Sequence, residues 1–254
     1  MNKDCLSIIY QYSYNDPGFL LYLHLSYPSI LEKDLTDWTF VSMNCKLNEK
    51  FIRCFYHRLS WNVLCIKQNL NESILRDFHY VLNWRNVCRY QKLSFRFLVD
   101  FEHKINWKVV SSSQRLDENA IIRFQDKISW KHISYKQQLS QKFMSYFKNK
   151  LSWYQLTETQ NMSNKFIIKH KDKVDWTIIF IKKRVSEKVI REYHKYWFQK
   201  HLYHDKIMWR YISEYQKLSE NFILSYKDFV DWNAILDHQD LSDEFLYNYH
   251  YGGL

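Results

Sequence analysis

Glycine and proline are scarce in this 254-residue chain, which contains three glycines and two prolines. The turns of β-sandwiches use both residues heavily, and a phosphate-binding loop needs several closely spaced glycines. No apolar stretch approaches the roughly 20 residues that cross a bilayer. The first residues, MNKDCLSIIYQYSYND, carry acids and tyrosines where a signal peptide has a plain apolar run. These absences argue against a β-sandwich, a nucleotide-binding loop and a membrane protein. They predict an intracellular protein.

Cysteines and catalytic motifs give no sign of chemistry. The five cysteines, an odd number without a C-x-x-C pair, are Cys5, Cys45, Cys54, Cys65 and Cys88. Reduced thiols that pack in an intracellular protein fit this pattern better than a disulfide framework. No Ser-His-Asp set and no carboxylate pair stand out, so we expect no enzymatic activity and no cofactor.

Tryptophan, in contrast, recurs at a fixed period. Seven Trp residues are each separated by 23 residues, and two more follow at the same spacing after one gap of 33. Such a run indicates a solenoid or array of repeats. Positions in a repeat are numbered below from its Trp. The nine are Trp38, Trp61, Trp84, Trp107, Trp130, Trp153, Trp176, Trp209 and Trp232.

Apolar and polar columns accompany the Trp. Position 3 is branched aliphatic, position 9 is Leu, Met or Val, and position 17 is aromatic or His, as in Ile133, Leu139 and Phe147. Spacings of three and four place side chains on one helical face, which predicts a buried side. Position 10 is always Asn, Ser or Asp, and so is the residue before each Trp except Met208. These residue types cap helix N-termini.

Each repeat therefore predicts two helices of about two turns, which are too short to be stable alone. Stacked neighbours must supply the burial. We predict an all-α fold, an α-solenoid that winds into a right-handed superhelix. Nine helix pairs would occupy residues 37–254, behind an N-terminal helical cap at residues 1–36.

The repeat at residues 176–208 carries ten extra residues, and its second helix is predicted to extend from Glu187 to about His204. The extension is either a tolerated insertion or a protruding helix that binds a partner or a second copy. The histidine cluster there lacks further ligands, so we predict no metal site and favour a basic, aromatic surface helix. The partner-binding residues would be Arg191, Lys195, Trp197, Lys200, His201 and His204.

Charge is uneven along the chain. Residues 165–217 hold 14 Lys or Arg and six acids, whereas residues 218–254 hold one Lys and seven acids. This polarity could steer an anionic partner or align copies head to tail. Nucleic-acid binding through residues 165–217 is one alternative function, and it predicts an affinity that falls steeply with salt. Its anion-binding residues would be Lys169, Lys171, Lys173, Lys182, Lys183, Arg184 and Lys188.

Two repeated columns invite a nucleic-acid interpretation. Gln fills position 7 in seven repeats, with Cys45 and Lys183 in the other two. RNA-reading repeats use amide columns, but such a code varies with the sequence read. A structural role is favoured, in which the amide satisfies backbone groups where the first helix ends. The Trp column could stack bases, but its place at a helix start in every repeat favours a core role.

The segments YISEYQKLSENFILSYKDFVDW (Tyr211 to Trp232) and NKFIIKHKDKVDW (Asn164 to Trp176) resemble a known class of repeats. They are similar to the short "LSE-x-FI…VDW" tandem repeats of large nucleocytoplasmic DNA viruses, the giant viruses. The resemblance covers roughly residues 38–250 and is weakest in the first four repeats. It implies a helical repeat protein made in an infected eukaryotic cell, with no enzymatic activity.

The predicted function is a non-enzymatic scaffold for protein–protein interaction, a viral protein that engages a host or viral partner. A host protein is favoured, in the host cytoplasm or nucleus. Nucleic-acid binding is one alternative. A virion structural or assembly component, which self-associates through its basic and acidic ends, is another.

Overall fold

The computed structural model describes residues 38–44, 46–198 and 205–251, and all regular structure in these residues is helical. The all-α repeat prediction is confirmed. The predicted cap at residues 1–36 lies outside the described residues, and the hand of the superhelix stays a prediction. The chain divides into two compact units, residues 1–129 and 130–254, with the boundary at the start of the fifth repeat.

In the first unit every first helix begins at the repeat Trp, as predicted. The first helices contact one another in chain order, which makes them one row of the stack. They are α3 (Trp38–Asn44), α5 (Trp61–Lys67), α7 (Trp84–Tyr90) and α9 (Trp107–Ser113). The second helices are α4 (Glu49–Phe55), α6 (Glu72–Asp77), α8 (Phe95–Asp100) and α10 (Glu118–Arg123).

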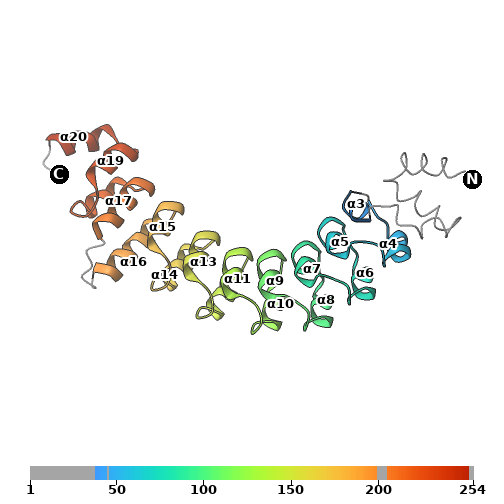
Figure 1. Cartoon of the computed structure of the whole chain (residues 1–254). Coiled ribbons are helices and arrows are strands. Elements are labelled where there is room, and N and C mark those ends of the chain that lie inside the picture. The colour runs from blue at the N-terminus through green and yellow to red at the C-terminus, as the bar shows by residue number, and fades with distance from the viewer. Residues whose placement is uncertain (1–37, 45, 199–204, 252–254) are drawn as a thin grey trace, which may run out of the picture. The chain divides into compact units, whose positions relative to one another are not determined.

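The second unit repeats this arrangement, with neighbouring first helices again in contact (Figure 1). Its first helices are α11 (Trp130–Lys136), α13 (Trp153–Thr159), α15 (Trp176–Lys182), α17 (Asp205–Tyr215) and α19 (Trp232–His238). Its second helices are α12 (Gln141–Tyr146), α14 (Asn164–Lys169), α16 (Glu187–Phe198), α18 (Glu220–Ser225) and α20 (Asp243–Tyr251).

Helix capping follows the prediction at eight of the nine position 10 residues, Ser186 being the exception, and only partly at the residue before Trp. The caps at position 10 have ψ near 150–167°. At this angle even the short serine side chain reaches the backbone N–H three residues later, and the Phe143 N–H donates to Ser140 Oγ at 3.1 Å. Before the Trp, ψ is near 89–108°, and the longer side chain of Asn106 still reaches Val109 N–H. Ser60 and Ser152 make no such bond, so their predicted capping is wrong.

The Trp column is part of the core, as the sequence favoured. Each Trp ring packs on the position 17 ring of its own repeat, with ring centroids from 4.3 Å apart for Trp107 and Phe124 to 5.2 Å for Trp38 and Phe55. In Trp61 the indole N–H also donates to the Tyr56 carbonyl, in the turn of the preceding repeat, at 2.8 Å. The ring therefore joins its own second helix to the repeat before it.

The Gln column joins consecutive repeats. Gln91 is only 2% exposed, and its amide makes three hydrogen bonds to the preceding repeat. Its Oε1 accepts from Leu70 N–H at 2.9 Å, and its Nε2 donates to the Cys65 and Gln68 carbonyls at 2.9 and 2.8 Å. Gln114, Gln216 and Gln239 make the same three contacts. The structural interpretation of the column is confirmed in these repeats, because the amide satisfies backbone groups where the preceding first helix ends.

A second column of small residues, at position 4, links repeats from the other end of the first helix. Ser134 donates to the Trp130 carbonyl at 2.7 Å and accepts from the Ser152 N–H of the next repeat at 2.9 Å. Cys88 takes the same place, and its sulfur accepts from Asn106 N–H at 3.4 Å. Cys65 and Cys88 are buried, free thiols, so their predicted packing role is confirmed.

The extra residues of the seventh repeat are divided between two helices. α16 has 12 residues where α14 and α18 have six, and α17 begins at Asp205, four residues before Trp209. The predicted lengthening of the second helix is seen as far as Phe198, and the rest of its predicted span, up to about His204, lies outside the described residues. Met208 lies inside α17, which explains why no capping residue precedes Trp209.

Candidate functional site

Comparison of equivalent positions among the nine repeats separates those that hold the repeats together from those that vary without a structural role. Positions 0, 7 and 10 change little because they carry ring packing, the Gln contacts and the caps. Positions 1, 5 and 6 of the first helices change from repeat to repeat, and positions 1 and 5 share one helical face. We call these three positions the outer first-helix face. Position 1 carries Thr39, Asn62, Arg85, Lys108, Lys131, Tyr154, Thr177, Arg210 and Asn233, all exposed except half-buried Thr177.

In the first unit this face is basic and aromatic on α7 and α9. Tyr90 is 50% exposed, and the Arg89 guanidinium lies 5.8 Å from its ring centroid. Arg85 and Lys108 are exposed and form no ion pair with any described residue. Tyrosine and arginine are enriched at protein interfaces, because they offer a large contact area together with a polar group.

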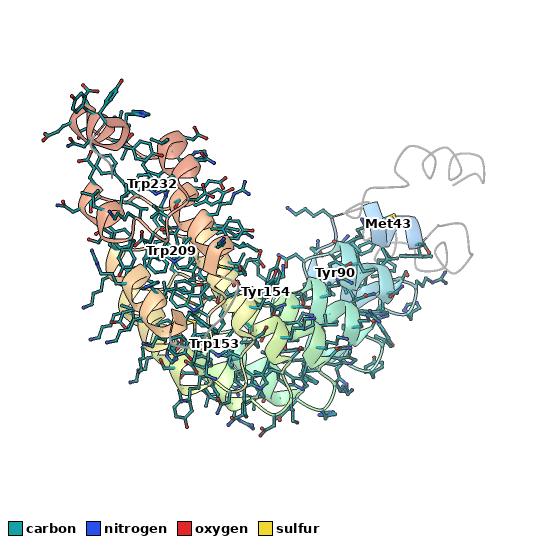
Figure 2. The ribbon with its side chains drawn as sticks, turned by 90° about the vertical axis from the view of Figure 1, so that its left-hand side faces the viewer. Met43, Tyr90, Trp153, Tyr154, Trp209 and Trp232 are labelled. Carbon is teal, nitrogen blue, oxygen red and sulfur yellow. The ribbon has the colours of Figure 1, made fainter. Side chains whose placement is uncertain are left out.

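In the second unit the face carries tyrosines on α11 and α13 and an isoleucine on α15. Tyr154 is 59% exposed, although Trp153 beside it packs on His170 with ring centroids 4.9 Å apart (Figure 2). Tyr135 and Ile181 are 46% and 37% exposed. Large exposed apolar side chains therefore occur on successive first helices.

In the first unit two arginines of the second helices pair with carboxylates of the neighbouring repeats. Arg53 pairs with Asp77, and Arg76 pairs with Asp100, each at 2.7 Å across consecutive repeats. The Arg76 guanidinium also lies 5.1 Å from the Phe97 ring centroid. These contacts occupy cations that would otherwise meet a partner, so the outer first-helix face offers the freer charge.

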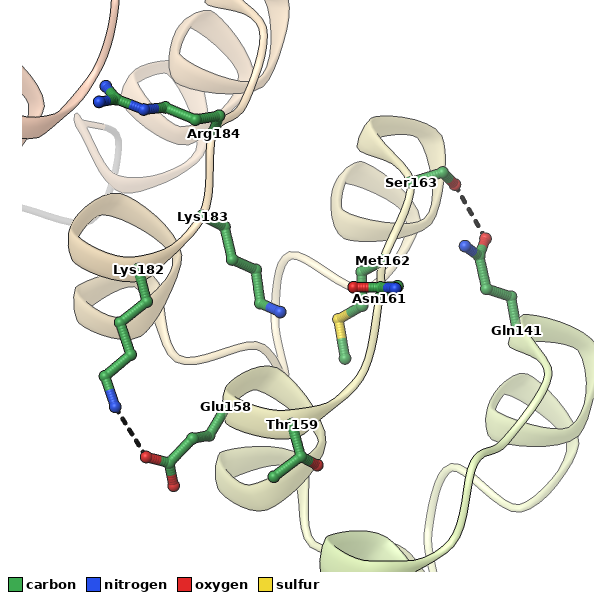
Figure 3. A pocket seen from close by; sticks show the side chains of 9 residues that line it. All are labelled: Gln141, Glu158, Thr159, Asn161, Met162, Ser163, Lys182, Lys183 and Arg184. Atoms are coloured by element: carbon green, nitrogen blue, oxygen red, sulfur yellow. Dashed lines mark hydrogen bonds and ion pairs between the residues drawn. The ribbon is translucent and has the colours of Figure 1, made fainter.

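The Gln column is interrupted at Lys183, and a pocket of about 600 Å³ lies at this interruption. It is in the second unit, where α13 and α15 end and the connections to α14 and α16 begin (Figure 3). Its lining is mostly polar. The lining residues are Gln141, Glu158, Thr159, Asn161, Met162, Ser163, Lys182, Lys183 and Arg184.

Lys183 makes one of the three contacts that a glutamine makes in this column. Its ammonium donates to the Gln160 carbonyl at 2.6 Å. Lysine has three N–H donors and no acceptor, so it cannot accept the Met162 N–H as a glutamine Oε1 would. In Figure 3 the side chain extends toward Asn161 and Met162, whereas the Arg184 guanidinium points away from them.

The charges around the pocket are unequal. Lys182 pairs with Glu158 at 2.7 Å, which offsets both charges at the rim. Arg184 donates to the Tyr215 carbonyl. Partial burial lowers the pKa of Lys183, because desolvation disfavours its charged form. An anion beside the ammonium would offset that desolvation.

The predicted anion-binding lysines do not form one surface. Lys182, Lys183 and Arg184 lie where a first helix ends, whereas Lys171 and Lys173 lie in the turn where α15 is about to begin. These are opposite ends of α15. Lys171 pairs with Glu192 at 3.3 Å, and Lys173 is 4.0 Å from Asp172. Lys169 and Lys188 are exposed on α14 and α16.

The residues predicted to bind a partner on the lengthened helix are only partly described. Arg191 lies over the rings of Phe222 and Tyr226, at 4.8 and 5.4 Å, which is the stacking contact of Arg76 in another repeat. Lys195 is exposed and Trp197 is half-buried against the core. Lys200, His201 and His204 lie outside the described residues. Within the described part of the chain no group of His, Cys, Asp or Glu could hold a metal ion.

Comparison with protein-family models, with curated proteins and with solved structures gives no match to this chain. Among the described helices none is long and apolar enough to cross a membrane.

Sequence reasoning missed the pocket, although it named three of its residues. The signal was present in the Gln column, where Lys183 is one of two exceptions. A lysine in a column of buried amides marks a place where the repeat contacts change. The outer first-helix face was also not predicted, because its residues vary from repeat to repeat and no constant column marks it.

Proposed function

We propose that the protein is a non-enzymatic helical-repeat scaffold that binds a protein partner through its outer first-helix face. The observation that carries this proposal is the contrast between the two rows of helices. In the first unit Arg53 and Arg76 of the second helices pair with carboxylates of the neighbouring repeats. On the first helices of that unit Arg85 and Lys108 form no ion pair with any described residue, and the exposed Tyr90 lies at a position that varies. Variable exposed side chains on a rigid repeat frame are the means by which solenoids bind partners.

The arrangement of cations favours a protein partner over a nucleic acid. Nucleic-acid binding needs a continuous basic surface that neutralises several phosphates. Lys171 and Lys182 are each paired with a carboxylate, and the basic residues of segment 165–217 are divided between opposite ends of a helix. The exposed Tyr90 and Tyr154 suit a protein interface.

The resemblance of residues 211–232 to giant-virus repeats supports a further part of the proposal. The chain would act in an infected eukaryotic cell, in the cytoplasm or nucleus, and its partner would be a host protein. Assembly of the virion through self-association is the competing role. Concentration-dependent mass in light scattering would favour assembly, and a stable monomer would count against it.

The test is an affinity pull-down of the tagged full chain from infected-cell and host-cell lysates, with and without nuclease. Three forms are compared: the natural chain, Tyr90→Ala with Tyr154→Ala, and Tyr80→Ala with Tyr146→Ala. The second pair is the matched control, because Tyr80 and Tyr146 are 63% and 81% exposed but lie outside the first helices. We expect one defined protein to survive nuclease and to be lost only with the first pair. Recovery of nucleic acid alone, or equal loss with both pairs, would overturn the proposal.

A further inference from the structure

The pocket at Lys183 is a donor-rich cavity that the repeat architecture does not require. In the neighbouring repeats an amide closes this place with three hydrogen bonds to the backbone, as Gln216 does. At Lys183 one bond remains, to the Gln160 carbonyl, so two N–H groups of the ammonium donate to no described residue. The Met162 N–H, which corresponds to the N–H groups that donate to a glutamine oxygen in other repeats, donates to no described residue. Both features call for an acceptor with negative charge.

The pocket borders the outer first-helix face. Thr159 and Lys182 are at position 6 of α13 and α15, and Tyr154 and Ile181 lie on the same two helices. The two helices contact each other directly. A chain segment that lies across this face would therefore bring one of its side chains to the pocket.

We propose that this pocket binds a carboxylate side chain of an acidic segment in the protein partner. This inference rests on the proposed function. The Lys183 ammonium would pair with the carboxylate, and the Met162 N–H would donate to it. Charge-assisted hydrogen bonds of this kind are about twice as strong as neutral ones. Partial burial of Lys183 fits this assignment, because a cation in a partly desolvated site is stabilised by a paired anion.

A peptide is favoured over a nucleic acid as the source of the anion. Glu158 offsets the charge of Lys182 at the rim, and the Arg184 guanidinium donates to the Tyr215 carbonyl, so the pocket lacks the several cations that a continuous chain of phosphates needs. One carboxylate needs only the single cation that points into the pocket. The tyrosine and isoleucine on the adjoining face would contact the apolar side chains of a peptide.

The first measurement is the binding of a fluorescein-labelled Glu-rich octapeptide, which contains one Leu and one Phe, to the purified full chain. Binding is detected by fluorescence anisotropy. The key variant is Lys183→Gln, which restores the amide found at this position in seven repeats. It is expected to unfold at the same temperature as the natural chain or higher, and to bind the peptide about tenfold more weakly, the loss of one charged hydrogen bond. Lys188→Gln is the control. This substitution removes the same charge, but Lys188 is exposed on α16 and lies outside the pocket. It is expected to bind as the natural chain does.

Other outcomes would overturn the inference. These are absence of peptide binding by the natural chain, equal weakening by the two variants, and tighter Lys183-dependent binding of a single-stranded oligonucleotide of equal charge. Inorganic phosphate serves as competitor, and displacement of the peptide by millimolar phosphate would assign the pocket to free anions instead. Failure here is separate from failure of the proposed function. If the pull-down succeeds while Lys183→Gln changes nothing, only the pocket assignment fails, and a failed pull-down with Lys183-dependent peptide binding removes the scaffold function alone.

Discussion

Replacement of Gln91 by Ala should open one interface of the solenoid, because its amide makes three hydrogen bonds to the preceding repeat at 2.8–2.9 Å. The side chain is 2% exposed, so water does not replace those bonds. A net loss of about 1 kcal/mol for each bond, with the cost of unpaired buried groups, gives about 3–5 kcal/mol. Because repeats contact only their neighbours, the loss falls on the junction of the second and third repeats.

The assay is urea unfolding followed by circular dichroism, together with amide hydrogen exchange. Gln239→Ala is a graded comparison, since it removes the same three contacts from a half-buried side chain, and we expect about 1–2 kcal/mol there. Gln138→Ala is the control at an exposed glutamine and should stay within about 0.5 kcal/mol. Exchange should accelerate at Leu70 N–H in Gln91→Ala. A loss below about 1 kcal/mol would refute the role of the amide column.

Three further predictions concern the constant columns. Trp130→Ala should lower the free energy of unfolding in urea by about 3–5 kcal/mol, because it replaces a large core side chain by a small one. Tyr146→Ala should lower it by less than about 0.5 kcal/mol. Equal losses in the two variants would place the Trp column on the surface. Asn106→Ala should lower the free energy of unfolding by about 1 kcal/mol because it removes a helix cap, whereas Ser60→Ala should change it very little. The reverse order in thermal melts would contradict the assignment of Asn106 as a cap. Burial raises the pKa of Cys65 to about 11 from 9.0, so the unfolded chain loses that proton first. Stability should therefore fall as pH rises from 9 to 11, and Cys65→Ser should reduce the fall; an unchanged slope would rule this thiol out.

Most of the fold could be predicted because the same sequence pattern recurs in nine repeats. The repeated Trp marked the start of every first helix except α17, and the capping residues placed the start of the second helices. The prediction was wrong for Ser60 and Ser152, because capping depends on the backbone angle before the helix as well as on residue type. The sequence also contains no sign that the first helix of the eighth repeat begins four residues before its Trp, because a run without glycine or proline does not show where one helix ends and the next begins.

The candidate site was harder to predict, because a site in a repeat protein consists of departures from the pattern. Lys183 departs from the Gln column, yet only its contacts reveal that it leaves an acceptor missing and a pocket open. The sequence predicted that the Trp153 ring lies in the core, but the variable column of Tyr154 gave no sign of where its ring lies. One ring is packed on a neighbouring helix and the other is exposed to solvent.

The account depends most on the claim that a protein partner contacts the first helices and not the second. A photo-crosslinking amino acid placed at Tyr90 or Tyr154, and in control forms at Tyr80 or Tyr146, tests it in infected cells. We expect the first two positions to yield one common crosslinked protein of defined mass and the control positions to yield none. Crosslinks from the control positions alone, or crosslinks to nucleic acid at Tyr154, would contradict the account.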